Sequence, residues 1–248
     1  MVGKVLLVGE SWVSVTTHYK GFNNFVSGDY DTGVAYFRRA MDGWCDWVHM
    51  PGHETQAVFP LEGEKLKDYS VIILSDIGAD TFLLHPKTWV NGERTPNRLR
   101  LLEEFVQSGG GLIMAGGYLS YQGINGAARY HGSPVEEALP VELEPYDDRV
   151  ECPEGVQPKV VKTEHVITNG LEETWPYLLG YNRVRVKKGV EVLATVQADP
   201  LLIVGGHGRG RAVAWMSDIG PHWCPREFAE WKGYTELWRR MITWASGE

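Results

Sequence analysis

The sequence contains few cysteines, and none of them are paired at a metal-binding spacing. Three cysteines occur among 248 residues, and Cys45, Cys152 and Cys224 lie far apart, without a CxxC motif. An odd and widely spaced set is typical of reduced thiols rather than of a disulfide framework or a structural zinc site. We therefore expect a cytoplasmic protein, and we expect neither a metal nor a cofactor.

Long apolar runs and basic clusters are also missing. No segment approaches the roughly 18 to 20 apolar residues that cross a membrane, and the apolar start, residues 1–9, lacks the features of a signal peptide. Lysine and arginine number 24 against 32 aspartate and glutamate, a formal net charge of −8, with no basic block to contact a phosphate backbone. These absences predict that the protein binds neither membranes nor nucleic acids.

Aromatic residues, by contrast, are abundant, with 10 Trp and 11 Tyr. This density is typical of a thick core or an oligomer interface, and a surface that stacks on sugars or bases is the alternative. The chain has 43% hydrophobic and 23% charged residues, in the ordinary globular range, without a repeat or a linker. We expect residues 1–248 to form a single domain that assembles into a homo-oligomer.

Short apolar runs predict three buried strands, at residues 4–9, 71–74 and 112–115. Helical spacing of apolar residues predicts helices at 33–43 and 97–107, between these strands. The connections are long enough for parallel pairing, so the pattern predicts a doubly wound α/β sheet.

The last part of the chain has a different pattern. Strands are predicted at residues 191–196, 200–204 and 211–216, and the glycine-rich turn 205–210 joins the last two as a β-hairpin. A phosphate-binding loop is a poorer interpretation of this turn, because no helix follows it. One amphipathic helix is predicted over 225–245.

Residues 13–31 lose all clear periodicity, and we expect them to form a long irregular loop. A loop of this length inside a compact domain is usually either functional or poorly ordered. His18, Asp29, Tyr30 and Asp31 lie in it, and they suggest a lid over a binding crevice, although ordinary surface polarity explains them equally well.

Three segments follow predicted strands, at the sheet edge where open parallel sheets bind ligands. They are residues 9–12, 75–80 and 116–121. Backbone amides of the glycine turn and of a helix after it are suited to hold an anion, whereas the alternative is that the glycines only permit close packing. The predicted ligand-binding residues are Glu10, Ser11, Asp76, Gly116, Gly117, Tyr118 and Ser120.

Four segments, residues 99–122, 165–171, 206–211 and 217–223, together resemble the class I glutamine amidotransferase-like family. The resemblance covers nearly the whole chain, and most bacterial members are uncharacterised cytoplasmic proteins. It implies a flavodoxin-like three-layer α/β/α sandwich, here with a C-terminal β-hairpin extension.

The resemblance also shows where this chain departs from its relatives. Class I amidotransferases place a nucleophilic cysteine in a G-x-C-x-G turn, because a thiolate must attack the glutamine amide. Here Gly116 or Gly117 occupies that place, and glycine has no nucleophile. The family's late His-x-Glu pair is represented by His222, with Cys224 where the acid is expected and Asp218 nearby. The resemblance therefore implies a pseudoenzyme without glutaminase activity.

Three hypotheses for the function follow. The first is a protein that binds a small polar metabolite, with a carboxylate or sugar hydroxyls, in the crevice. The second is a hydrolase or isomerase that uses His222 as general base, with Asp218, Asp76 or Glu10 as its partner. The third is a non-catalytic oligomeric scaffold.

Two nucleophiles are less favoured within the second hypothesis. Ser120 lies past the place of the family's nucleophile, and Cys224 is two residues from His222, a spacing at which side chains of an extended segment point apart.

Overall fold

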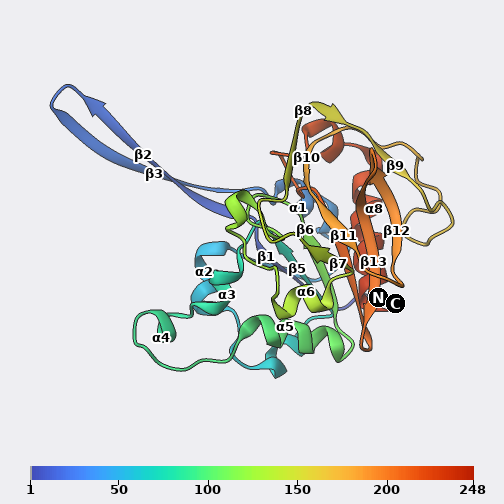
Figure 1. Ribbon diagram of the computed structural model, residues 1–248, viewed down its shortest axis with the longest axis horizontal. Helices are drawn as coiled ribbons and strands as arrows, with labels where there is room; N and C mark the ends of the chain where they lie inside the picture. The colour runs from blue at the N-terminus through green and yellow to red at the C-terminus, as the bar shows by residue number, and fades with distance from the viewer. Residues whose placement is uncertain (1) are drawn as a thin grey trace.

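The structure, a computed structural model, describes residues 2–248 and is built around one eight-stranded sheet (Figure 1). Its strand order is β4-β1-β5-β6-β14-β13-β12-β9. The first five strands pair in parallel, and the other three pair antiparallel. The strands are β1 (Val5–Gly9), β4 (Trp47–Met50), β5 (Val71–Ser75), β6 (Gly111–Ala115), β9 (Pro158–Val160), β12 (Glu191–Val196), β13 (Asp199–His207) and β14 (Gly210–Trp215).

The five parallel strands have the order 2-1-3-4-5 when they are counted along the chain, which is the order of flavodoxin-like folds. The hairpin β13–β14 extends this sheet, because β14 pairs in parallel with β6 and antiparallel with β13. The predicted flavodoxin-like α/β fold with a C-terminal hairpin is confirmed.

Helices form the two outer layers. Helices α1 (Ala35–Met41) and α8 (Lys232–Ser246) pack together, and α8 covers β5, β6 and β14. Helices α2 (Gly52–Val58), α3 (Ala79–Leu83) and α5 (Arg98–Gln107) form the other layer, because right-handed crossovers running in opposite directions along the sheet place their helices on opposite faces.

The remaining elements are short. They are η1 (Gly63–Asp68), α4 (Pro86–Trp89), η2 (Ile124–Gly126), α6 (Pro134–Ala138), α7 (Arg226–Ala229), and the strands β7 (Val141–Leu143), β8 (Arg149–Val156), β10 (Leu178–Asn182) and β11 (Val184–Val186). Strands β8 and β10 form one small antiparallel sheet, and β7 and β11 form another.

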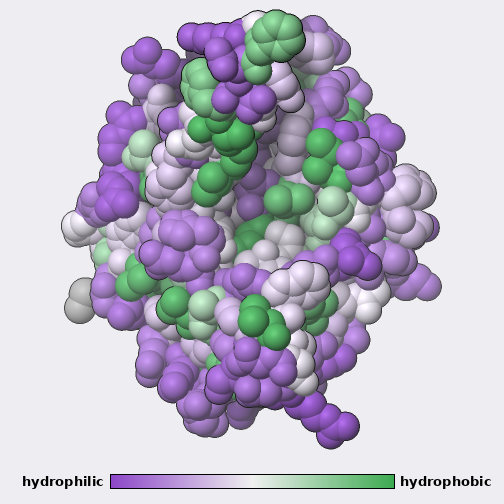
Figure 2. Space-filling view, turned by 90° about the vertical axis from the view of Figure 1, so that its left-hand side faces the viewer, coloured by the Kyte–Doolittle hydropathy of each residue, from purple (hydrophilic) through white to green (hydrophobic). Residues whose placement is uncertain are grey.

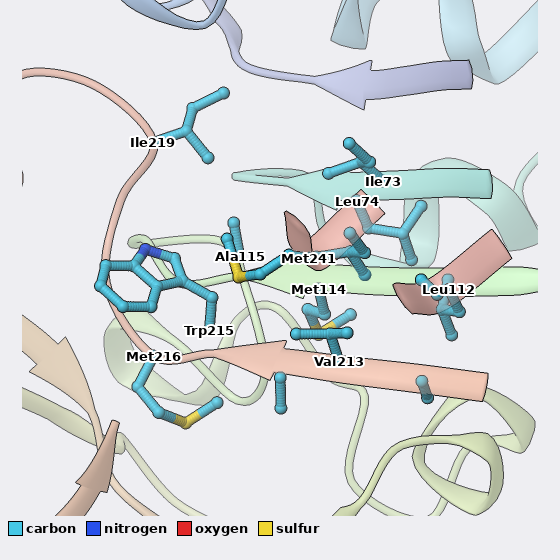
Figure 3. Close-up of a cluster of buried hydrophobic side chains, with 14 of the residues drawn as sticks. Ile73, Leu74, Leu112, Met114, Ala115, Val213, Trp215, Met216, Ile219 and Met241 are labelled. Carbon is cyan, nitrogen blue, oxygen red and sulfur yellow. The ribbon is translucent and has the colours of Figure 1, made fainter. Parts of the chain in front are cut away.

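The core lies between the central strands and α8. Figure 3 shows buried side chains of β5, β6 and β14, among them Leu74, Met114 and Trp215, together with Met241 of α8. These side chains are almost completely buried. Strands that are covered on both faces need continuous apolar runs, and this is why β1, β5 and β6 were predictable from the sequence.

The predicted helix 225–245 is in fact two helices, α7 and α8. The backbone of Trp231 is extended between them, with φ −61° and ψ 134°. The Trp231 indole covers Gly233 so closely that a Cβ there would lie 2.1 Å from the ring. The chain therefore turns at this tryptophan instead of continuing one helix.

Residues 11–32 form two paired strands, so the prediction of an irregular loop is wrong. Strands β2 (Ser11–Lys20) and β3 (Asn23–Thr32) make an antiparallel ribbon that projects far from the rest of the molecule (Figure 1). We call this ribbon the arm. Because its far end points away from the sheet edge, the arm does not close over a crevice as the lid hypothesis requires. Within residues 2–248, every helix is too short or too polar to span a bilayer.

Candidate functional site

The candidate site lies where the neighbouring strands β1 and β5 end. Glu10 and Asp76 are the first residues after these strands, and both have a positive φ, 49° and 45°. Such a conformation is uncommon for residues other than glycine, and it marks positions that the surrounding structure holds in place. In a sheet of this order the connections change direction between these two strands, and ligands bind there.

A pocket of about 270 Å³ opens at this point. It is lined by Glu10, Trp12, Asp76, Tyr118, Asp218, Pro221 and His222. A larger depression, of about 570 Å³, lies near the amino-terminal ends of β5 and β6. The charged side chains that line the larger depression are all exposed, whereas the smaller pocket contains buried carboxyl groups, so the smaller pocket is the candidate site.

Asp218 and His222 form a hydrogen-bonded pair in the pocket. Nδ1 of His222 lies 2.9 Å from Oδ2 of Asp218, and the backbone N–H of Trp223 donates to the same oxygen at 2.8 Å. A carboxylate partner makes Nδ1 the protonated nitrogen. This hydrogen bond raises the pKa of His222, and burial raises the pKa of Asp218. In residues 2–248 no group is hydrogen-bonded to Nε2 of His222, which is the nitrogen able to accept a proton.

Tyr118, which follows the two glycines of the turn, contacts His222. The two rings meet edge to face, with their centroids 4.3 Å apart. The guanidinium of Arg149 lies over the Tyr118 ring, 4.7 Å from its centroid. The structure therefore places His222, which is distant in sequence, beside the turn that follows β6.

Glu10 is buried, and its carboxyl group is protonated at neutral pH. Its Oε2 accepts a hydrogen bond of 2.6 Å from Ser75 Oγ. Burial, with a further contribution from the charge of Asp218, raises the pKa of Glu10 to about 8. Gly33 makes room for this carboxyl group, since a Cβ there would lie 1.9 Å from Oε1 of Glu10.

The amides of the glycine turn are already occupied. Leu119 N–H donates to Oδ1 of Asp76 at 2.6 Å, and Gly117 N–H donates to Oδ1 of Asn182 at 3.0 Å. Gly116 N–H donates to the backbone oxygen of Ser217. No helix follows the turn directly. The amides of Gly116, Gly117 and Leu119 are therefore bonded within the protein, and this arrangement favours the alternative, in which the turn serves packing rather than the binding of a ligand anion.

Gly117 nevertheless shapes the site. Its φ is 141°, and a Cβ there would lie 2.8 Å from Oδ1 of Asp218 and 3.0 Å from Oδ1 of Asp76. The glycine therefore lets two carboxyl groups approach the same point of the backbone. Burial raises the pKa of Asp76, and the charge of Asp218 adds to this effect.

Ser11 and Ser120 are predicted ligand-binding residues that do not line the pocket. Ser11 Oγ accepts a hydrogen bond from Gly52 N–H, and so it links the arm to α2. Ser120 is buried, and its Oγ accepts a hydrogen bond from Asp76 N–H. Both serines hold the backbone around the site, so neither is placed to touch a ligand. The buried Ser120 does not fit the role of nucleophile.

Cys224 does not fit that role either. Its side chain is fully buried, and burial raises the pKa of its thiol well above the usual range. The reactive thiolate is therefore disfavoured. Among residues 2–248, no group of three or more His, Cys, Asp or Glu side chains is arranged to hold a metal ion.

Sequence reasoning missed some residues of the site. Trp12 and Pro221 line the pocket, and Asn182 orients the glycine turn through two hydrogen bonds to Gly117. Trp12 lay within a segment predicted to reach the sheet edge. The role of Asn182 could not be predicted from the sequence, because Asn182 lies in β10, which belongs to a small separate sheet and reaches the turn only in the folded protein.

The protein is therefore an α/β protein with the strand order of flavodoxin-like folds. Its acidic pocket lies between β1 and β5, where the connections of the sheet change direction. Residues 4–247 match the family described as "Putative glutamine amidotransferase" (GATase1_like), and the chain belongs to this family. The resemblance predicted from the sequence is confirmed. No curated protein matches the chain.

Two solved structures from Salmonella are close to this one. The cytoplasmic protein STM3548 of Salmonella typhimurium is 39% identical, with a TM-score of 0.94 over 97% of this chain and 98% of its own. The cytoplasmic protein STM1381 of Salmonella typhimurium LT2 is 40% identical, with a TM-score of 0.93 over 98% and 99%. A ThuA-like protein of Parabacteroides merdae, 14% identical with a TM-score of 0.62 over 99% and 90%, shares the fold.

Proposed function

We propose that the pocket binds a small neutral polyhydroxy compound and transfers protons on it, as a hydrolase or an isomerase does. The observation that carries this proposal is the Asp218–His222 pair beside the protonated carboxyl group of Glu10. One group is ready to accept a proton, and the other is ready to donate one. Two titratable groups with different protonation states in one pocket are the usual basis of acid–base catalysis.

The pocket lining favours hydroxyl groups over a carboxylate in the ligand. Of the residues 2–248, those that line the pocket include three with carboxyl groups and none with the charge of lysine or arginine. An anionic ligand would therefore be repelled. The ring of Trp12, which is 41% exposed, offers a flat apolar surface, which suits the face of a sugar ring. A volume of about 270 Å³ favours a ligand of one ring.

The family's own reaction is not expected. Glycine stands at the nucleophile's place, Cys224 is buried, and the amides of the turn are bonded within the protein. We infer a pseudoenzyme with respect to glutamine hydrolysis. Purified protein should release no more ammonia from glutamine than a heat-denatured sample, and release above that background would overturn this inference.

The cellular location is inferred from two observations. Cys45, Cys152 and Cys224 are all free thiols, as in proteins of a reducing compartment. Both Salmonella structures carry the description "cytoplasmic protein". We infer a cytoplasmic location for this chain.

The test of the proposed chemistry begins with a thermal-shift panel of neutral monosaccharides, polyols and sugar acids, because specific binding raises the melting temperature. Compounds that bind are then incubated with the protein, and their conversion is followed by proton NMR. The His222→Gln variant should keep the thermal shift and lose turnover by roughly 10²- to 10⁴-fold. His165→Gln, whose ring lies against Trp244 away from the pocket, is the matched control.

Turnover by His222→Gln at the wild-type rate would overturn the acid–base role. Binding of a neutral sugar without turnover by the wild type would favour the second candidate, a metabolite-binding protein. That candidate is supported by the missing nucleophile, because binding needs no covalent chemistry.

A further inference from the structure

The arm has one apolar face and one polar face. Residues that lie opposite each other in the β2–β3 pairing share a face, and Val15 lies opposite Gly28. All charged residues of the two strands, namely Lys20, Asp29 and Asp31, belong to the other face. The apolar face consists of Val13, Val15, Thr17, Tyr19, Asn24, Val26, Gly28 and Tyr30.

Within residues 2–248, the apolar face has little cover: only near its base does the Tyr30 ring meet that of His53, edge to face, with the centroids 4.9 Å apart. Val15 is 69% exposed, Val26 63% and Tyr19 78%. In Figure 2, apolar side chains gather near the top of the molecule, where the arm points towards the viewer. A ribbon with valines and tyrosines on one face and all of its charged residues on the other is typical of a strand pair with one buried face. A hairpin without such cover is only marginally stable in water.

The polar face, in contrast, is satisfied by its own contacts. His18 stacks on Phe25 with their centroids 4.5 Å apart, and it is hydrogen-bonded to Ser27 Oγ at 3.1 Å. Lys20 lies over the Phe25 ring, 5.7 Å from its centroid. This face also carries the partly exposed rings of Trp12 and Phe25, but all of the charged residues of the two strands lie on it and suit it to solvent, so we place the occupant on the apolar face.

We propose that a second copy of this chain covers the apolar face, with the two arms packed face to face about a two-fold axis. A two-fold interface places the same surface on both sides, so the surface must be compatible with itself. The apolar face meets this condition because it carries no charge. The rest of the molecular surface is less compatible with itself, because two chains that each have a net charge of −8 repel each other.

The size of the face suits this role. Ten residues per strand span about 33 Å, which takes most of the arm clear of the acidic body. Taking about 100 Å² for each valine and about 150 to 200 Å² for each tyrosine, and counting only their exposed fractions, the uncovered apolar area is roughly 400 Å². This is about half of the roughly 800 Å² that each partner contributes to a standard interface, and polar residues of the same face, such as Thr17 and Asn24, add to it.

The test compares two doubly substituted chains by sedimentation velocity and light scattering. Val15→Asp with Val26→Asp places two carboxylates on the apolar face. Thr16→Asp with Asn23→Asp adds the same charge to the polar face and is the matched control. Wild type and control should have a mass of at least twice 27.9 kDa, whereas the apolar-face variant should have the monomer mass.

We expect the dissociation constant of the apolar-face variant to rise at least about 100-fold, because the interface would bury unpaired carboxylates. A monomeric wild type, or an apolar-face variant that assembles like the wild type, overturns the proposal.

A shortened arm gives a second test that does not depend on the folding of the charged variant. Trp12 and Asp31 lie opposite each other, so an Asn-Gly turn in place of residues 13–30 closes a tight hairpin between them. This chain should be a monomer with the thermal shifts of the wild type for pocket ligands. If it still forms the wild-type oligomer, the arm is not the interface.

Discussion

At the scale of single residues, Gly117 has a backbone conformation that only glycine adopts easily, and its lack of a side chain leaves room for two carboxyl groups of the pocket. Gly117→Ala should destabilise the protein by about 1–3 kcal/mol, because its φ of 141° is strained for any other residue. The new Cβ should also push Asp76 and Asp218 apart, since it would lie within 3.0 Å of both carboxyl groups. Ligand binding in the thermal-shift panel should weaken at least about tenfold, a cost of ~1.4 kcal/mol.

Gly132→Ala is the control for Gly117→Ala. Gly132 also has a positive φ, 71°, but a Cβ there meets nothing within 4 Å. Urea unfolding should show destabilisation in both variants, whereas only Gly117→Ala should lose ligand binding. Equal loss of binding in both would contradict the role of Gly117 in the pocket.

Glu10 should make the stability of the protein depend on pH. Its pKa rises from 4.5 to about 8 on folding, so the folded state keeps a proton that the unfolded state releases in this range. Stability is therefore highest below pH 4.5 with respect to this group, and it falls by up to about 5 kcal/mol as the pH rises through 8. Glu10→Gln, which cannot ionise, should remove this slope from urea unfolding measured between pH 5 and pH 9.

Glu93→Gln changes an exposed glutamate and should leave the slope as in the wild type. A wild type whose stability changes no more between pH 5 and pH 9 than that of Glu10→Gln would contradict the raised pKa of Glu10.

At the scale of elements, Arg98 joins three helices. It is completely buried at the start of α5, and it donates hydrogen bonds to backbone oxygens at the ends of α2 and α3. Its acceptors are Thr55, Gln56, Phe59, Thr81 and Phe82. Burial lowers the pKa of Arg98 to about 10, so the side chain remains charged at neutral pH and complements the negative ends of both helices.

Arg98→Met should cost at least about 3 kcal/mol of unfolding free energy, because it leaves several buried carbonyl groups without a donor. Arg98→Lys should recover part of this loss, since an ammonium group reaches fewer of them. Arg129→Met, which removes the exposed ion pair with Asp80, should stay within about 1 kcal/mol of the wild type. Chemical denaturation of the three variants checks the order, and an Arg98→Met variant as stable as Arg129→Met would refute it.

Elements that depend on local composition were predicted well from the sequence. Strands β1, β5 and β6 and helix α5 were all found, because burial on both faces and helical spacing leave direct marks on the sequence. The arm was missed because a ribbon with little cover in its own chain alternates only weakly, with threonine, glycine and asparagine among the apolar positions.

The site was predictable to a similar extent. Glu10 and Asp76 both line the pocket, and their closeness could be predicted because the carboxyl ends of neighbouring parallel strands meet at one edge. The pairing of Asp76 with the amides of the glycine turn was not predictable, because it depends on the positive φ of Asp76 and on the path of a distant loop. For the same reason the sequence could not show that Ser120 is buried.

At the scale of the whole molecule, stability should differ sharply between the body and the arm. The central sheet is covered by helices on both faces, whereas the arm beyond its base is held by its own ladder of hydrogen bonds and by contacts between its own side chains. Regions with few buried apolar contacts open at low free energy and exchange their amide protons quickly. Hydrogen exchange measured by mass spectrometry on peptides that cover β2–β3 and β5 should separate the two regions.

In the monomeric variant Val15→Asp with Val26→Asp, arm amides should exchange at least about 100-fold faster than those of β5, since an isolated hairpin is marginally stable. In the wild type at high protein concentration, the arm should be protected, and dilution should remove this protection while β5 stays unchanged. An arm that is equally protected in the monomeric variant would show that the ribbon is stable alone. The exposed valines and tyrosines would then need no partner, and the reason for a second copy would disappear.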